Sequence, residues 1–196
     1  MTDPVRDGEA ADDGDDHRKD DAADDDNHRD GEAADDGDSA VDDAKESTFL
    51  VTHADADSAV LKDVHDGQVH ALGSNPGVDV DDAIEGTVAP DPPLELSWQL
   101  IDLAERRPLS IDESEEPPTV RERELAAAQS VGELTREPRA GIGELHVITV
   151  DEEQTAEAVD DVLEDREGTL SRAARLGVNR VEIRSEPGVL SVRYLP

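Results

Sequence analysis

The stretch from Ala59 to Leu72, AVLKDVHDGQVHAL, decides the fold of the chain around it. Two runs rich in Val and Leu flank Asp66 and Gly67, and an Asp-Gly pair between such runs is typical of a two-residue type I′ turn. The stretch is therefore predicted to be a β-hairpin with strands over 59–65 and 68–72. The cross-strand pairs that this loop length predicts are Val64 with Val69, Asp63 with His70, and Leu61 with Leu72.

More short strands are predicted on both sides of this hairpin. One covers 48–53, a second covers 78–88, and in a third, over 94–100, Leu and Trp alternate with polar residues. Gly86 lies where a barrel strand would bend. About five short strands in roughly 60 residues are typical of a small β-barrel. The sequence VDDAIEGTV around Gly86 also resembles the strand that enters many OB-type barrels, so an OB-like barrel is expected over 47–111.

A charged, proline-bearing stretch begins at Glu105, and the linker to a second module is placed at residues 112–118. Thr119 and Glu122 then have the spacing of a capping box, which predicts the start of a helix. The face of this helix that is expected to be buried comprises Val120, Ala127, Ala128, Val131 and Leu134.

Residues 119–196 as a whole are predicted to form an α-β-α-α-β-β module. Asp151 and Thr169 are the expected N-caps of its second and third helices. The strands over 145–150 and 180–185 should run parallel. A last strand over 190–194 should be antiparallel to the strand over 180–185. The expected fold class is therefore α+β, with a three-stranded mixed sheet beside the barrel.

The first 46 residues are predicted to be a disordered acidic tail. They hold 20 acidic and 5 basic residues and contain a ten-residue sequence twice, RDGEAADDGD, at Arg6 and at Arg29. Such a composition cannot bury enough apolar surface to offset the entropy of ordering the backbone.

The acidity extends over the whole chain, whose formal net charge is −34. Residues 47–196 alone carry −19, and 15 of the 18 bases are Arg. Dense carboxylates cost little self-repulsion in molar salt, where the Debye length falls to ~3 Å. The balance is typical of a halophilic protein, so acidity indicates an environment more than a partner.

Composition excludes several classes of function. The chain has no cysteine, which excludes disulfide scaffolds, thioredoxin-like redox sites, zinc ribbons and cysteine nucleophiles. The sequence contains neither a membrane-spanning apolar run nor a signal peptide, so a cytoplasmic location without membrane contact is expected. It has no motif for nucleophilic catalysis or phosphate cradling either, and no cofactor is expected.

Histidines around the hairpin are the candidate metal ligands. His53, His65 and His70 could ligate zinc together with Asp63 if the strands bring them together. An Asp63–His70 cross-strand hydrogen bond would explain two of the same residues without a metal.

Arginines near the C-terminus are the candidate binding residues. Residues 140–167 have a net charge of −9, whereas 168–196 have +3. The candidate binding set is Arg172, Arg175, Arg180, Arg184 and Arg193. These side chains could contact RNA phosphates or an acidic partner, or they could pair with acids of the preceding helix, such as Asp160, Asp161 and Glu164.

Residues 48–196 resemble an uncharacterised haloarchaeal protein family, known only as a domain of unknown function. The matching stretches are FLVTH from Phe49, LKDVHDGQVH from Leu61, IEGTVAPDPPLEL from Ile84, EPPT through RERELAA, VGELTRE from Val131 and the terminal VRYLP. The resemblance implies a source and supplies no activity.

These observations favour a non-catalytic binding protein of a halophilic archaeal cytoplasm, associated with RNA or a ribonucleoprotein. The main alternative is a protein–protein interaction adaptor without a nucleic-acid role, which the shortage of aromatic residues favours, since binding of single strands needs stacking rings. An enzyme of unrecognised type is the third possibility.

Overall fold

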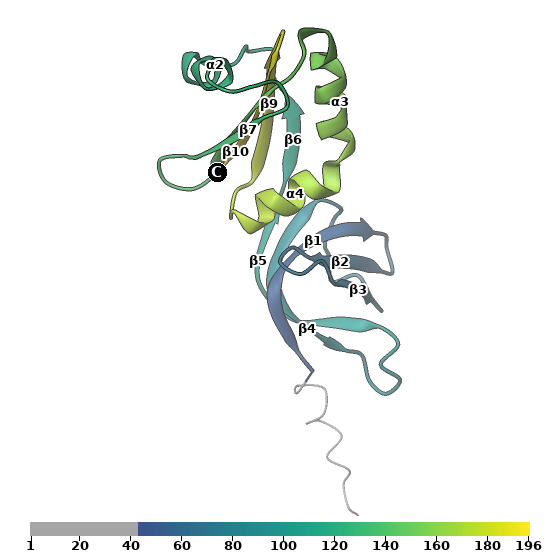
Figure 1. Cartoon of the computed structure of the whole chain (residues 1–196). Coiled ribbons are helices and arrows are strands. Elements are labelled where there is room, and N and C mark those ends of the chain that lie inside the picture. Colours follow the sequence, from purple (N-terminus) through teal and green to yellow (C-terminus); the bar gives the residue numbers. More distant parts are fainter. Residues whose placement is uncertain (1–42) are drawn as a thin grey trace, which may run out of the picture. The chain divides into compact units, whose positions relative to one another are not determined.

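Strand β1 (Lys45–Ala54) opens the part of the chain that the computed structural model describes, residues 43–196 (Figure 1). It begins before residue 47, where the barrel was expected to start, because Lys45 and Glu46 pair with strand β4 (Asp82–Pro90). The rest of the predicted disordered tail, with its repeated sequence, lies outside the described residues.

Five strands close a barrel in the order β1-β2-β3-β5-β4 (Figure 1). The remaining members are β2 (Ala59–Asp63), β3 (Val69–Leu72) and β5 (Trp98–Pro108). Neighbouring strands are antiparallel except β3 and β5, which pair in parallel at Leu72 and Trp98. The barrel core consists of Phe49, Val51, Ala59, Leu61, Leu72, Val78, Ile84 and Val88. The prediction of a small barrel built largely from aliphatic residues is therefore confirmed.

The predicted register of the central hairpin was wrong by two residues. Leu61 lies opposite His70, and the loop between the strands runs from Val64 to Gln68. The two-residue turn does not form because the Asp63 carboxylate accepts the backbone N–H of His65 at 2.8 Å, which organises a longer loop. A shift of two residues keeps every side chain on its predicted face, because side chains alternate with a period of two.

Gly86 has the role predicted for it. A Cβ atom at this position would lie 2.3 Å from the carbonyl oxygen of Asp102 on β5. The β4–β5 register shifts between Glu85 and Gly86, so the strand bends where the residue without a side chain allows β5 to approach.

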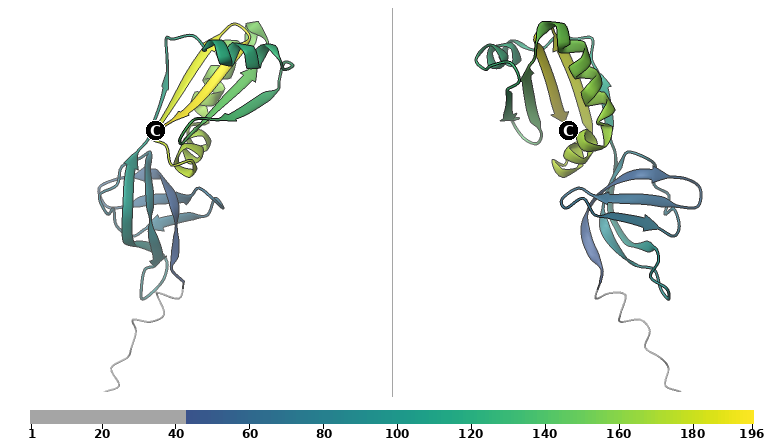
Figure 2. Two further views of the ribbon diagram at one scale, coloured as in Figure 1. Left: turned by 90° about the vertical axis from the view of Figure 1, so that its left-hand side faces the viewer. Right: turned by 45° about the vertical axis from the view of Figure 1, so that its right-hand side comes forward.

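The second sheet has five strands rather than three, in the order β6-β9-β10-β8-β7 (Figure 2). The predicted strands are β8 (Glu144–Thr149), β9 (Arg180–Glu186) and β10 (Val189–Leu195). As predicted, β10 is antiparallel to β9; β8 is antiparallel to β10 and so runs in the direction of β9. The unpredicted strands, β6 (Ser110–Glu113) and β7 (Leu134–Pro138), are short, and acidic residues or proline obscure their strand pattern.

Helices cover both faces of this sheet (Figure 2). On one face lie α3 (Thr155–Glu164), which follows a 3₁₀ turn at Glu152–Gln154, and α4 (Arg166–Arg175). Ala158, Val159, Val162 and Leu163 of α3 pack on the core, as do Leu170, Ala173 and Ala174 of α4. The N-cap of α4 is Asp165 rather than Thr169, because the Asp165 side chain accepts the N–H of Gly168. Asp151 precedes the 3₁₀ turn without a side-chain cap bond.

Helix α2 (Val120–Ala127) covers the other face, and its predicted buried face was wrong. The predicted capping box of Thr119 and Glu122 is present. However, α2 buries Glu122 and Ala126, whereas Val120 is 64% exposed. The helix packs through a carboxylate because the sheet face beneath it is polar.

The stretch from Glu105 to Glu113, predicted to begin the linker, belongs to strands β5 and β6. One hydrophobic cluster then joins the two sheets: Leu50, Val64 and Ala83 of the barrel half pack with the side chains of β9, β10, α3 and α4. Residues 43–196 fall within one compact unit, and the division into two separate modules stays a prediction. Within this range no helix is long and apolar enough to cross a membrane.

Candidate functional site

Most of the predicted arginine site is an internal ionic network centred on Glu182. The Glu182 carboxylate lies 2.5 Å from Nε of Arg184, 2.6 Å from Nη1 of Arg193 and 3.4 Å from Nη1 of Arg180. The β9–β10 register puts all four residues on the polar sheet face, because Arg193 lies opposite Glu182 and Arg180 and Arg184 alternate with its neighbours on β9. Arg184 also pairs with Glu116 at 2.5 Å. Arg180, Arg184 and Arg193 therefore form ion pairs within the chain, and their role in binding stays a prediction.

Glu122 of α2 completes this network. Its carboxylate accepts a hydrogen bond from the Ser191 hydroxyl at 2.8 Å and lies 3.3 Å from Nε of Arg193. The side chain is 1% exposed. Burial alone would raise the pKa of Glu122, but the hydrogen bonds from Thr119 and Ser191 and the Arg193 charge outweigh burial and hold its pKa below the ordinary value. The network thus fixes α2 on the sheet.

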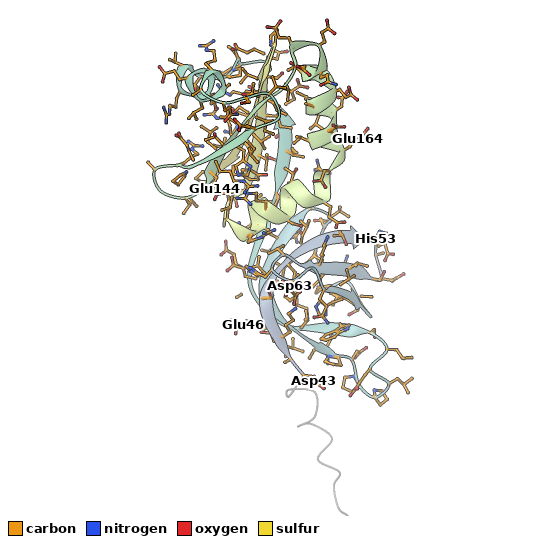
Figure 3. All side chains as sticks on the ribbon, in the orientation of Figure 1. Asp43, Glu46, His53, Asp63, Glu144 and Glu164 are labelled. Carbon is orange, nitrogen blue, oxygen red and sulfur yellow. The ribbon has the colours of Figure 1, made fainter. Side chains whose placement is uncertain are left out.

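Arg172 and Arg175 lie on α4, on the opposite side of the sheet. Arg172 pairs with Glu144 and donates from Nε to His146 at 3.2 Å, and its guanidinium lies 5.9 Å from the centre of the Tyr194 ring. Figure 3 labels Glu144, the first residue of β8. Arg175 is exposed and has no ion pair among residues 43–196. The acids of α3 expected to pair with these arginines, Asp160, Asp161 and Glu164, are not their partners in this range.

The four candidate metal ligands do not converge. His53 lies at the far end of the β1–β2 ladder from Asp63 (Figure 3), and it is exposed beside Asp55 at 3.6 Å. His65 is exposed in the hairpin loop, whereas His70 is fully buried. Among residues 43–196 no group of three His, Asp or Glu side chains is arranged to hold a metal ion. The zinc hypothesis was therefore wrong for this set.

Asp63 has a structural role in the hairpin loop. Its carboxylate lies 2.7 Å from Nζ of Lys45 and accepts the backbone N–H of His65. Burial opposes ionisation, yet the bonds from Lys45 and the loop backbone lower the pKa of Asp63 from 3.8 to about 2. The alternative Asp63–His70 hydrogen bond does not form either.

His70 lies instead in the aromatic part of the barrel core. Its ring packs edge to face against Phe49, at 5.6 Å between centroids, and against Trp98, at 4.3 Å. Neither ring nitrogen has a hydrogen-bond partner among the described residues. Burial is the main cause that lowers the pKa of His70 below 6.5. The neutral ring is accordingly the form that fits this site.

The loop between β4 and β5 carries the most exposed apolar side chains of residues 43–196. Leu94 is 73% exposed and Leu96 is 87% exposed. Both were predicted to alternate into a half-buried strand, but β5 begins only at Trp98. The alternation of apolar and polar residues is real, but the backbones of Asp91 and Ser97 bond to each other, so residues 92–96 form the loop between β4 and β5.

This loop has an ordered base. The Asp91 N–H donates to the carbonyl of Ser97 at 2.8 Å, and the Ser97 hydroxyl donates to the Asp91 carboxylate at 3.2 Å. Gly73 fits against the same two side chains, because a Cβ there would lie 2.9 Å from the Ser97 hydroxyl oxygen. The N–H of Gly73 also bonds to the carbonyl of Trp98. Leu94 and Leu96 therefore lie on a loop whose two ends are held together by hydrogen bonds.

The bases of the barrel are all engaged within the chain. Lys45 pairs with Asp63 and Asp66, and Lys62 pairs with Glu167. Arg106 pairs with Asp79 and Asp82, and Arg107 pairs with Glu85 and Glu105. Phe49 is fully buried, so it offers no ring for base stacking. Every base of residues 45–108 is consequently ion-paired, and of the Phe and Trp rings in this range only Trp98 is partly exposed.

Comparison with known proteins places this architecture in a family without an assigned function. Neither the curated proteins nor the solved structures contain a significant match to the chain. A family model, described as "Family of unknown function (DUF5812)", matches residues 45–185, which run from the first residue of β1 into β9. The chain is a member of the DUF5812 family.

Proposed function

We propose that this protein is a non-catalytic binding module that captures a protein partner through Leu94 and Leu96. The observation that carries the proposal is the exposure of these two large apolar side chains on a loop whose base is held by hydrogen bonds. Exposed apolar side chains that cluster on a surface mark sites of interaction with a partner.

The composition supports binding of the partner through apolar contacts rather than through charged groups. A chain with net charge −34 is suited to molar salt, where screening reduces attraction between exposed charges to a range of ~3 Å. Apolar contacts are not weakened in this way, and excluded salts strengthen them. Asp91 and Glu95 flank the leucines. The complementary partner surface is thus an apolar pocket bordered by basic or neutral groups, within a halophilic cytoplasm.

RNA binding is the second candidate, supported by two observations. The strand order β1-β2-β3-β5-β4, with its parallel β3–β5 pair, is the order of OB-like barrels, many of which bind oligonucleotides. Arg136, Arg139 and Arg175 also form no ion pair with residues 43–196. Against this candidate stand the paired bases and buried ring of the barrel itself.

Site-specific crosslinking distinguishes the two candidates. A photoreactive amino acid at position 96, and in a separate protein at position 120, is irradiated in cells at native salt. Residue 120 is the matched control because Val120 is similarly exposed but lies on α2. We expect position 96 to crosslink reproducibly to one protein species and position 120 not to do so, with Leu94→Asp abolishing the product. Equal crosslinking from both positions, or a product destroyed by ribonuclease, would overturn the proposal.

A further inference from the structure

His70 lies next to Trp98, the strand residue at which the β4–β5 loop ends; this loop, residues 91–97, is called the docking loop below. The His70 ring contacts Trp98, the first residue of β5; Asp91 directly follows β4, Ser97 directly precedes β5, and these two loop residues are hydrogen-bonded to each other. The parallel pair Leu72–Trp98 closes the barrel at the same place. A change in the packing of Trp98 is consequently transmitted to the base of the loop that carries Leu94 and Leu96.

Protonation of His70 is incompatible with its surroundings. The imidazolium ion has two N–H donors, and neither ring nitrogen has an acceptor among the described residues. The ring packs against Phe49 on β1 and Trp98 on β5, and Leu61 on β2 lies opposite it in the β2–β3 ladder. A buried cation without hydrogen bonds costs several kcal/mol and is relieved by admitting water.

The charged groups near the ring do not compensate for its burial. Lys45 on β1 disfavours the imidazolium, whereas Asp63 at the end of β2 and Asp66 in the hairpin loop favour it. Lys45 pairs with both carboxylates, at 2.7 Å and 2.6 Å, and offsets one of their two negative charges, so burial remains the largest influence on the pKa of the ring. Strand β5 presents the uncharged Trp98 to the ring, and the charged groups that shift its pKa lie on β1, β2 and the hairpin loop.

We propose that His70 is an acid-sensitive switch of the docking loop: protonation of its ring disrupts the edge-to-face contact with Trp98 and loosens the base from which Leu94 and Leu96 project. The route of opening is at Trp98 because this side chain is only partly buried, whereas Phe49 on the other side of the ring is fully buried. The functional meaning of the switch rests on the proposed function, but the conformational change does not.

Trp98 reports the switch directly, because it is the single tryptophan of the chain. Its emission is recorded from pH 8 to pH 4.5 in molar salt for the wild type, for His70→Leu and for the control His146→Gln. We expect a red shift in the wild type with a midpoint below 6.5, no such transition in His70→Leu, and an unchanged transition in His146→Gln. An identical transition in His70→Leu, its absence from the wild type, or a midpoint above 6.5 would overturn the proposal.

Two further measurements keep the outcome unambiguous. The NMR titration of the His70 ring in the unaltered protein gives the midpoint without any substitution, so a poorly folded His70→Leu variant does not block the test. Crosslinking from position 96 at pH 7.5 and pH 5.5 then connects the switch to the loop. If Trp98 responds but crosslinking does not require Leu94, the proposed function fails and the switch stands; if crosslinking requires Leu94 and Trp98 does not respond, the switch fails alone.

Discussion

Buried carboxylates carry much of the structural specificity of this protein at the scale of single residues. Glu122 and Glu182 hold α2, β9 and β10 together through arginines that an inspection of net charge assigns to a binding surface. The sequence reveals which residues share a face of the β9–β10 hairpin, because side chains alternate between the two faces along each strand. It does not reveal that Glu122 of α2 covers that face. The capping box with Thr119 is already a sufficient reason for a glutamate at this position.

Replacement of Glu122 tests this role. Glu122→Gln removes the charge that faces Arg193 and should lower the free energy of unfolding by ~2 kcal/mol, the usual contribution of a hydrogen bond to a charged group. Because the folded-state pKa of Glu122 lies below its ordinary 4.5, the stability is present above that pH and is lost as the pH falls through the folded value. Glu124→Gln on the same helix, where Glu124 is 64% exposed, should change little in urea unfolding at fixed salt.

Asp63 provides a second prediction at the residue scale. Its pKa falls from 3.8 to about 2 in the folded protein, which corresponds to about 2 kcal/mol of stability. This contribution should be complete above pH ~4 and should disappear as the pH falls toward 2. Asp63→Asn should therefore be less stable than wild type at pH 7 and nearly equal at pH 2, as measured by urea unfolding. Asp66→Asn, at an exposed partner of the same lysine, should lose less; an equal loss would contradict the account.

At the scale of elements, strands with regular alternation were predictable and short strands were not. The hairpin around Gly67, the bend at Gly86 and the strands β8, β9 and β10 follow from turn residues and period-two patterns. Strands β6 and β7 have four and five residues and owe their existence to neighbours distant in sequence. Leu94 and Leu96 were wrongly assigned to a strand. Their segment has the alternation of a strand, but no neighbouring strand pairs with it.

Gly86 gives the element-scale prediction. Gly86→Ala would place a methyl group 2.3 Å from the Asp102 carbonyl, so β4 and β5 must separate locally. We expect a loss of about 1–3 kcal/mol in the free energy of unfolding, the usual cost of overpacking. Thr87→Ala, at the next residue of the strand, should cost less than ~1 kcal/mol. Equal effects of the two substitutions would show that the close approach of the strands is unimportant.

At the scale of the whole molecule, the charge predicts salt dependence. Residues 47–196 carry a net charge of −19, and the Debye length grows from ~3 Å at 1 M salt to ~10 Å at 0.1 M. Repulsion between carboxylates should therefore lower the thermal midpoint in dilute buffer, while the ion pairs around Glu182, being partly buried, are screened less. A thermal midpoint that is independent of potassium chloride from 0.1 M to 3 M would contradict the halophilic interpretation.

The measurement that tests the central claim most directly is the salt dependence of the partner's affinity. The crosslinked partner is purified and titrated against the full chain and against the Leu94→Asp, Leu96→Asp double variant at potassium chloride concentrations from 0.3 M to 3 M. Apolar capture predicts an affinity for the wild type that is constant or rises with salt, and a loss of at least tenfold in the double variant at every concentration. An affinity that falls steeply with salt and is unchanged in the double variant would contradict apolar docking through this loop and would favour contacts with phosphates.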